Sequence, residues 1–444
     1  MTQQKITIIG SGLAGSFLAV LLAKRGYKVK IYERLSKEEI FDVASKRSYN
    51  LVLFGYGITI LKQAGLWDII EPHLLALKGS VTHIASSAKP VITLTDNNEM
   101  PYFTIARGLL ADILLKEATR HPSVTFHDNT SLIAINKHEK TMVVNNVKTQ
   151  KITTLSYDVL IGSDGVNSLV RPSLQQGMES NHKQEYAQWS YKQFILGPEW
   201  TNKLGLEKKF VHIWTQKDTF IIAHPDSDDS LGAMLVFPKN LSGSLNSSET
   251  VSSYFKKNFP DLLPAIGEIE KAILKNPDGN FATILTEPWY YRDSIAIIGD
   301  AAHGFYPFFG QGTSAAFGDA IELCTLLDEC DSDWSKIFPL YQEERKKNTD
   351  ALAELSKEAL RKNLRFKKGD YDAIYDKLQT MAYHFLPTII YPPLSQTITT
   401  DPGHAAKHRH HYYTQRKIAN KFGVSLIVKG IGGTLSLYEK LKKV

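Results

Sequence analysis

The sequence predicts an α/β fold with a second, inserted β-sheet and a helical C-terminal part. Three observations predict it. An apolar strand over 6–9, a helix over 17–25 and a strand over 28–32 form a βαβ unit around a glycine turn. Between residues 211 and 238 apolar residues alternate without intervening helices, which indicates a separate sheet. From residue 341 onward the composition is charged and helix-favouring, apart from a proline break at 391–393.

The elements between these regions follow from the same periodicities. A helical region is expected over 58–77, a second helix over 108–120 and short strands that end at 159–161. A further apolar strand over 295–298 leads through another glycine-containing turn into a long helix. The first sheet is therefore expected to be built from pieces that are discontinuous in the sequence.

The composition is that of an ordinary globular protein. The 444 residues are 43% hydrophobic and 22% charged, which is enough for two or three domains and typical of neither disorder nor a fibre. Lys and Arg total 52 against 46 Asp and Glu, and the basic residues are spread out, so nucleic acid is not an expected partner. No metal is expected either, because a solvated helix face is the simpler interpretation of His404, His408, His410 and His411.

The cysteines and the apolar runs bear on the compartment. Cys324 and Cys330 lie in a predicted helix with their side chains pointing in different directions, which predicts a reducing cytoplasm. The apolar run at 6–9 leads directly into the glycine turn, unlike a signal peptide. The stretch 424–438 is interrupted by Lys429 and three glycines, so it is not expected to span a membrane. Contact of this C-terminal region with a membrane surface remains an alternative.

The first chemistry-bearing motif is the turn Gly10-Ser11-Gly12-Leu13-Ala14-Gly15, followed by Glu33 at the end of the next strand. The three glycines permit a tight turn, approach of a pyrophosphate to the backbone, and close packing of helix on strand. The helix N-terminus adds free N–H groups and a favourable dipole. Glu33 would accept hydrogen bonds from the ribose hydroxyls of an adenosine, and its charge would repel a 2′-phosphate. FAD or NAD is therefore expected here rather than NADP. The alternative is a glycine turn without a ligand.

Two further motifs follow at strand-to-helix turns. One is Gly162-Ser163-Asp164-Gly165, and the other joins Gly299-Asp300 and His303 to Pro307 and Gly310-Gln311-Gly312. The Gly310–Gly312 turn would direct backbone N–H groups and a helix N-terminus at a part of a ligand where negative charge gathers. The alternative for Asp164 and Asp300 is helix capping. His303 is expected to be a structural hydrogen-bonding residue rather than a base.

These three motifs, in this order, resemble the single-component, class A flavin monooxygenases. The resemblance implies a Rossmann-type, glutathione-reductase-like FAD-binding domain. It also implies that the Asp164-Gly165 turn lies near the pyrophosphate and that Asp300 binds the ribityl chain. Further cofactor positions that it implies are Leu13, Ala14, Arg34, Arg47, Val52, Arg107, Leu132, Gly312, Thr313 and Ser314. A flavin-side pocket, without an assigned general base, is expected at Pro307, Phe308, Phe309 and Gly310.

A narrower resemblance rests on longer segments. YFTIARGLLADILLKEA (102–118), HIWTQKDTFIIAHPD (212–226) and PFFGQG (307–312) resemble kynurenine 3-monooxygenases, and YPPLSQTITTDPGHAAKH (391–408) resembles the violacein-pathway indole hydroxylases. The resemblance implies tightly but noncovalently bound FAD, transient NADPH or NADH, and O2. It also implies hydroxylation of a small, tryptophan-derived aromatic through a C4a-hydroperoxyflavin.

The resemblance also implies a division of the chain. Residues 1–78, 104–177 and 281–345 would form the FAD-binding domain, with residues 79–103 and 178–280 as the substrate domain. The remaining residues, 346–444, would form C-terminal helices that cap the pocket and exclude water.

The substrate positions of the kynurenine enzymes are not retained. In that family an arginine, two tyrosines and an asparagine hold the amino-acid end of the substrate, and these positions fall at Ser80, Leu94, Leu394 and Ala359. A desolvated carboxylate without its arginine is costly, so L-kynurenine is expected to be a poor substrate and an indole derivative a better one. Three alternatives stay open: kynurenine 3-hydroxylation proper, a non-hydroxylating FAD oxidoreductase of the polyprenyl-reductase type, and a flavin-binding regulatory protein.

Overall fold

The computed structural model describes residues 4–40, 50–84, 89–95, 102–364 and 371–421, so Arg47 lies outside the described residues. The first sheet has six strands in the order β18-β19-β12-β1-β2-β8, parallel except for the β18–β19 pair. Its strands are β1 (Lys5–Ile9), β2 (Lys28–Tyr32), β8 (Val124–His127), β12 (Val159–Gly162), β18 (Tyr290–Tyr291) and β19 (Ile295–Ile297).

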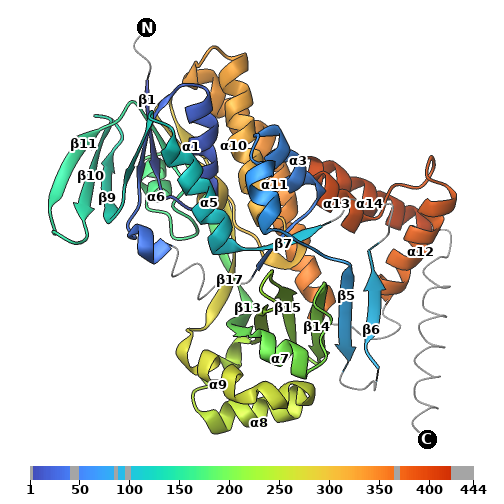
Figure 1. Ribbon diagram of the computed structural model, residues 1–444. Helices are drawn as coiled ribbons and strands as arrows, with labels where there is room; N and C mark the ends of the chain where they lie inside the picture. Colours follow the sequence, from blue (N-terminus) through green and yellow to red (C-terminus); the bar gives the residue numbers. More distant parts are fainter. Residues whose placement is uncertain (1–3, 41–49, 85–88, 96–101, 365–370, 422–444) are drawn as a thin grey trace, which may run out of the picture.

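Three helices pack together beside this sheet (Figure 1): α1 (Leu13–Lys24), α5 (Arg107–Arg120) and α10 (Gly312–Glu329). The helix α1 lies between the other two, and ten of its twelve residues are buried. Its centre contacts α10 through stacked rings of Phe17 and Phe317, whose centroids are 4.3 Å apart. This apolar packing fixes the glycine turn, which joins β1 to α1, at the carboxyl end of β1.

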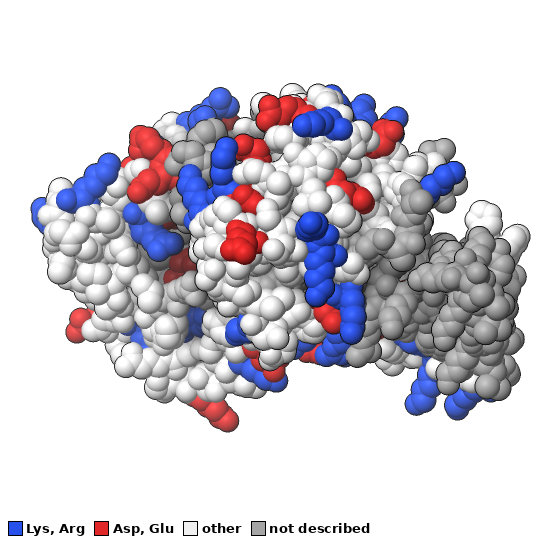
Figure 2. Space-filling model, turned by 90° about the horizontal axis from the view of Figure 1, so that it is seen from below, with Lys and Arg blue, Asp and Glu red and all other residues white. Residues whose placement is uncertain are grey.

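Two three-stranded sheets flank the first sheet. One contains β9 (Thr130–Asn136), β10 (Thr141–Asn146) and β11 (Ile152–Ser156), and the other contains β3 (Asn50–Leu53), β4 (Leu75–Ala76) and β7 (Phe103–Ala106). The strand β7 leads directly into α5. Figure 2 shows acidic and basic side chains interspersed over the lower face of the molecule, with wide uncharged areas between them.

The second large sheet has seven strands in the order β17-β13-β16-β15-β14-β5-β6, antiparallel except for β14 beside β5. The strands are β5 (Gly79–Ile84), β6 (Val91–Leu94), β13 (Asn181–Leu196), β14 (Phe210–Gln216), β15 (Thr219–Pro225), β16 (Leu231–Pro238) and β17 (Gly279–Glu287). One face packs on α8 (Ser248–Asn258) and α9 (Ile266–Lys275), through a core that includes Trp214, Ile221 and Leu235. The other face is directed toward the first sheet's side of the molecule (Figure 1).

The C-terminal part is helical, as expected. It comprises α11 (Trp334–Leu364), α12 (Tyr371–Phe385), α13 (Leu394–Thr400) and α14 (Ala405–Lys421). The helix α11 packs against α10, and α12, α13 and α14 lie to the right in Figure 1. The expected proline break falls between α12 and α13. Within the described residues, no helix combines the length and the apolar character that crossing a membrane requires.

One predicted element is wrong in extent. The region 58–77 is not a continuous helix, because α3 (Gly55–Gln63) ends before Gly65, which adopts a positive φ of 63°. A short helix α4 (Trp67–Ile70), a 3-10 turn and the strand β4 follow instead. The alternating segment 211–238 is confirmed as strands, since β14, β15 and β16 all fall within it or at its edge.

Candidate active site

The glycine turn is closed toward the protein at two positions and open at the third. Gly10 has a φ of +97°, and a Cβ there would lie 2.7 Å from the Ser163 carbonyl oxygen. A Cβ on Gly15 would lie 2.1 Å from the Gly10 carbonyl oxygen. A Cβ on Gly12, by contrast, would meet nothing within 4 Å. The backbone is therefore accessible at Gly12, where a pyrophosphate has to approach.

Glu33 is held against this turn by hydrogen bonds. Its Oε2 accepts from the Ser11 N–H at 2.9 Å, and its Oε1 accepts from the Leu35 N–H at 3.1 Å. The Glu33 carbonyl accepts from the Thr130 N–H at 2.6 Å, so β9 begins at the same place. Leu132, two residues further on, has a buried side chain, whereas Arg34 is exposed. The carboxylate is thereby fixed beside the phosphate turn, where a ribose would lie.

Asp164 both caps a helix and carries an unused oxygen. Its Oδ2 accepts from the Leu169 and Val170 N–H groups at 2.7 and 3.1 Å, at the start of α6 (Val170–Gln175). The capping interpretation is thus confirmed for this oxygen. Its Oδ1 is buried and has no partner among the described residues, and burial raises the pKa of the carboxyl. The neighbouring Gly165 has a φ of +79°, with open space where a Cβ would be.

The third motif lies against the first. Gly299 has a φ of +57°, and a Cβ there would lie 3.2 Å from the Ala14 Cβ, so the turn packs on the start of α1. Asp300, the next residue, is exposed. Arg171 links the second motif to the third by donating to the Ala301 carbonyl at 2.9 Å. The three motifs are therefore brought together, as the resemblance implied.

The N-terminus of α10 supplies further unpartnered polar atoms. The Gln311 Oε1 and the Ser314 Oγ are buried without a hydrogen-bond partner among the described residues. Gly310, which has a φ of +63°, lies against the Phe54 ring, and Gly312 faces open space. Buried polar atoms normally have partners, so these groups indicate a polar ligand. Together with the open glycine positions, they fit the pyrophosphate and ring edge of FAD.

The remaining predicted cofactor positions lie at the edge of this site. Arg107 is exposed and is the first residue of α5, directly after Ala106, which pairs with Asn50 across β7 and β3. Val52 is half-buried in β3, and Thr313 is half-buried in the first turn of α10. The polarity of Arg107 suits a phosphate or a flavin carbonyl, whereas Val52 offers only apolar contact.

A buried charged network, which the sequence analysis missed, supports the third motif. Asp319 is fully buried in α10 and accepts from His303 Nε2 at 2.6 Å and from Arg345 Nε at 2.8 Å. It also accepts from the Gly299 N–H at 2.9 Å. Burial opposes ionisation of Asp319, but the nearby His303 and Arg345 outweigh it and lower the pKa to about 2. The structural role expected for His303 is consistent with this pairing.

The two phenylalanines of the predicted pocket face different surroundings. Phe308 packs near Phe220 and Phe281 of the seven-stranded sheet, with ring centroids 5.8 and 5.1 Å away. Phe309 packs instead against the apolar cluster of the C-terminal helices. Pro307 and Gly310 bound the same 3-10 turn, Pro307–Phe309. The turn therefore separates the seven-stranded sheet from the C-terminal helices.

The four substrate positions are only partly brought together. Ser80 pairs with Thr93, so these two side chains share one face of the sheet. Leu94 pairs with Gly79 on the opposite face and is 69% exposed. Leu394 and Ala359 are buried in α13 and α11. A shift of one residue in the alignment would place Thr93, rather than Leu94, at the tyrosine position.

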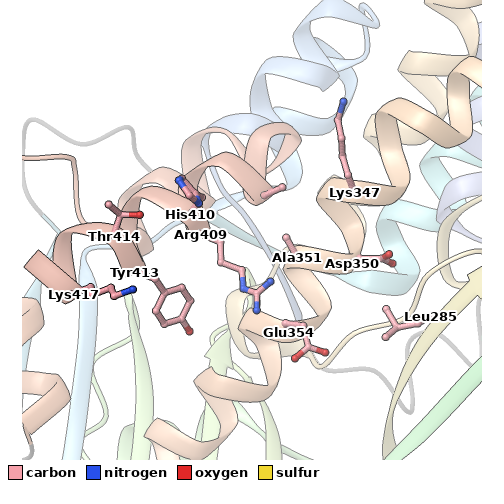
Figure 3. A pocket seen from close by; sticks show the side chains of 11 residues that line it. Leu285, Lys347, Asp350, Ala351, Glu354, Arg409, His410, Tyr413, Thr414 and Lys417 are labelled. Atoms are coloured by element: carbon pink, nitrogen blue, oxygen red, sulfur yellow. The ribbon is translucent and has the colours of Figure 1, made fainter.

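A separate groove of about 550 Å³ lies between α11 and α14 (Figure 3). Its walls include Asp350, Glu354, Arg409, Tyr413 and Lys417, and none of the predicted flavin residues. Nearby, a carboxylate does lie beside two of the C-terminal histidines, because His404 and His408 contact Asp401 at 2.9 and 3.2 Å. Among the described residues, however, no group of three potential ligands is arranged to hold a metal ion.

Comparisons with known proteins identify the class. Residues 3–356 match the model of the FAD binding domain family. The chain is 34% identical over 356 residues to a protein named kynurenine 3-monooxygenase from Legionella pneumophila, covering 79% of this chain and 78% of the relative. A protein of the same name from Dictyostelium discoideum is 31% identical over 376 residues, covering 81% and 80%.

Solved structures show the same fold. 2-methyl-3-hydroxypyridine-5-carboxylic acid oxygenase matches with a TM-score of 0.69 at 20% identity, covering 90% of this chain and 98% of that one. PqsL of Pseudomonas aeruginosa, described as a probable FAD-dependent monooxygenase, matches with a TM-score of 0.64 at 17% identity, covering 82% and 97%. The fold and the three motifs thus define an FAD-dependent aromatic monooxygenase. Within that class, this chain belongs to the family of the kynurenine 3-monooxygenases, flavoproteins that use FAD and NAD(P)H.

Proposed function

We propose that this enzyme hydroxylates a neutral, tryptophan-derived aromatic compound rather than L-kynurenine. FAD supplies the oxygen chemistry when bound, and NADPH or NADH and O2 are consumed with the substrate. We further propose the division into domains given above, with residues 1–78, 104–177 and 281–345 holding FAD. We also propose a cytoplasmic location, with which the free cysteines Cys324 and Cys330 are compatible.

The proposed cofactor residues have distinct tasks. Gly12 and the N-terminus of α1 bind the pyrophosphate, and Glu33 accepts from a ribose. Asp300, exposed beside the start of α1, binds the ribityl chain. The N–H groups at the start of α10 stabilise negative charge at the flavin ring. The orphaned oxygens of Asp164 and Ser314 support this assignment, since a bound cofactor or its ordered water would satisfy them.

The proposed substrate site lies between the Pro307–Gly310 turn and the seven-stranded sheet. Phe220, Met234, Val236 and Phe281 form an apolar cluster on that sheet face, with Phe308 packed against it. An aromatic ring is stabilised there by burial and by edge contacts with the phenylalanines. Such a wall also keeps water from the flavin side of the site, which limits loss of reduced cofactor to side reactions.

The observation that carries the substrate assignment is the absence of a cationic anchor at the positions that hold the amino-acid end in the kynurenine enzymes. Ser80 is half-buried and pairs with Thr93 and Val211, so its sheet neighbours are uncharged. The names of the relatives favour kynurenine as the alternative substrate. A carboxylate buried at Ser80 would lack the bidentate partner that an arginine provides.

The experiment is to measure hydroxylated product per NADPH, with L-kynurenine against a panel of indoles and quinolones, under labelled O2. We expect label in the product of a neutral aromatic and weak coupling with L-kynurenine. Tight coupling and micromolar saturation with L-kynurenine would overturn the substrate assignment. Oxidation of NADPH without label in any product would instead favour a reductase of the polyprenyl type.

A further inference from the structure

A histidine of β15 lies on the substrate-facing side of the seven-stranded sheet. Side chains alternate along a strand, so Phe220, Ile222 and His224 share one face of β15. Phe220 packs with Phe308 of the flavin-side turn, and Ile222 belongs to the same apolar cluster. His224 therefore continues the proposed substrate wall away from Phe308.

The strand register places His224 in one row with Ser80. Gly232 pairs with His224 across β16 and β15. In β14, His212 pairs with Ala223 and Val211 pairs with Ser80, so the β14–β15 register continued by one residue places Val211 between His224 and Ser80. Neighbouring strands are about 4.8 Å apart, so His224 and Ser80 are separated by roughly 10 Å on the same face. Gly232 contributes no side chain to this row, and Asn50 of β3 packs over it. The row Thr93–Ser80–Val211–His224–Gly232 contains no Lys, Arg, Asp or Glu.

The imidazole of His224 has an unused polar atom, although its backbone is anchored. Its Nδ1 is buried without a hydrogen-bond partner among the described residues, while the side chain as a whole is half-buried. The Asn50 Nδ2 donates to the carbonyls of His224 and Pro225 at 3.4 and 3.1 Å. Asn50 also packs over Gly232, where a Cβ would lie 3.4 Å from the Asn50 backbone nitrogen. The backbone at His224 is thus anchored by Asn50, whereas the Nδ1 atom of its ring is left unsatisfied.

Two histidines on the other face of the same sheet, in contrast, have ring nitrogens that contact the protein. His83 Nε2 contacts His212 Nδ1 at 3.1 Å, and His212 Nε2 contacts the Glu207 carbonyl at 2.9 Å. The His83 ring also stacks on Trp214, with centroids 4.6 Å apart. His212 has both nitrogens engaged by the protein, in contrast to His224.

The protonation state of His224 restricts what it can bind. Burial lowers the pKa of its imidazole to about 4, so the ring is neutral at physiological pH. A neutral imidazole offers one donor and one acceptor and attracts no carboxylate by charge. Its natural partner is an uncharged hydroxyl, carbonyl or N–H group.

We propose that His224 is a specificity-determining residue that hydrogen-bonds an uncharged polar group of the aromatic substrate, in the row that also contains Ser80. This assignment rests on the proposed function and narrows the class of substrate. The preferred substrates are aromatics whose polar substituent at this end of the site is neutral. An amino-acid ammonium and carboxylate would meet an uncharged row and leave their charges unpaired.

The test uses two aromatic probes of similar size, one with hydrogen-bonding groups and one without. 2-Aminoacetophenone has the ring, amine and ketone of L-kynurenine without its ammonium and carboxylate, and ethylbenzene has no hydrogen-bonding group. Dissociation constants of the oxidised holoenzyme are measured from perturbation of the flavin absorbance, which needs no turnover. The variants are His224→Leu and His224→Gln, with His212→Gln on the opposite sheet face as the matched control.

We expect wild type to bind 2-aminoacetophenone at least tenfold more tightly than L-kynurenine. His224→Leu should weaken 2-aminoacetophenone roughly fivefold to tenfold, as expected for one hydrogen bond, and leave ethylbenzene unchanged or tighter. His224→Gln should recover most of the loss, and His212→Gln should leave the ratio of the two constants unchanged.

Equal losses for both probes in His224→Leu would overturn the proposal, because they would reflect packing alone. Unchanged binding of both probes would also overturn it. Failure of the proposed function gives different results: wild type would then bind L-kynurenine more tightly than 2-aminoacetophenone, or no aromatic compound would perturb its flavin spectrum or stimulate NADPH oxidation.

Discussion

Asp319 and His224 are two buried titratable groups that the fold treats in opposite ways. Asp319, beside the flavin turn, accepts from His303, Arg345 and the Gly299 backbone, so its interactions are complete without a ligand. His224, on the seven-stranded sheet, has a buried nitrogen with no partner among the described residues. The difference indicates that Asp319 stabilises the structure of the site, whereas His224 is available to bind a ligand.

The largest effects are expected at the glycine turn, where Gly15 is required by the protein's own packing and Gly12 is left open for the cofactor. Gly15→Ala places a Cβ 2.1 Å from the Gly10 carbonyl oxygen, so the backbone has to move and the folded protein should be lost. Gly12→Val meets no protein atom at its Cβ, so the fold should survive while FAD affinity falls at least roughly a hundredfold. Flavin content and far-UV circular dichroism of both purified variants check this.

Normal FAD content in a folded Gly12→Val variant would show that the pyrophosphate binds elsewhere. Wild type should release free FAD on denaturation, because binding is expected to be noncovalent, and the apoprotein should be reconstituted by added FAD. Colourless apoprotein that cannot be reconstituted would contradict the cofactor assignment itself.

Asp319→Asn tests the buried network around Asp319. The substitution leaves the Arg345 guanidinium buried without its carboxylate, which costs about 3–5 kcal/mol in the free energy of unfolding. Equilibrium unfolding in denaturant, followed by circular dichroism, measures this loss of stability. The control is Asp328→Asn, which removes a partly exposed pair with Arg25 at 2.7 Å and should cost less than about 1 kcal/mol. Equal losses in the two variants would show that the buried network adds nothing specific.

Ser80→Arg tests the other region by restoring charge to the uncharged row. A guanidinium at this position can pair with a substrate carboxylate, so L-kynurenine should bind roughly tenfold more tightly. Ser80→Gln, similar in length but neutral, should give no such gain. The dissociation constants from flavin absorbance decide it, and equal gains in both variants would indicate that size, not charge, is limiting.

The flavin-binding turn could be predicted from sequence because its causes are local. A glycine is required at Gly10 by a positive φ and at Gly15 by contact with the preceding strand, and both lie within six residues. Glu33 is one strand away in a βαβ unit of standard length. Motif spacing therefore carries most of the geometry of this part of the site.

Other features depend on contacts between distant residues. Asp319 and Arg345 lie on different helices, and nothing in either helix pattern distinguishes a buried ion pair from two surface charges. The resemblance assigns Ser80 and Leu94 to the same end of the substrate site, but in the β5–β6 register Ser80 pairs with Thr93 and Leu94 lies on the opposite face. Strand alternation gives the relative face of His224 and Phe220, whereas only the packing of α8 and α9 determines which face is free for substrate.

The smallest expected effect concerns the pH dependence of stability. The pKa of His224 is about 4 in the folded protein and 6.5 in the unfolded chain, so the unfolded chain binds an extra proton between these values. The free energy of unfolding is not reduced by this histidine above about pH 6.5, and it decreases as the pH falls from 6.5 toward 4. Because the side chain is half-buried and partly screened, we expect a loss of about 1 kcal/mol between pH 7 and pH 5.

Urea titrations of wild type and His224→Leu at both pH values isolate the contribution of His224, since other groups titrate equally in the two proteins. The variant should lose about 1 kcal/mol less stability than wild type over this interval, and identical losses would mean that the imidazole is not desolvated in the folded state.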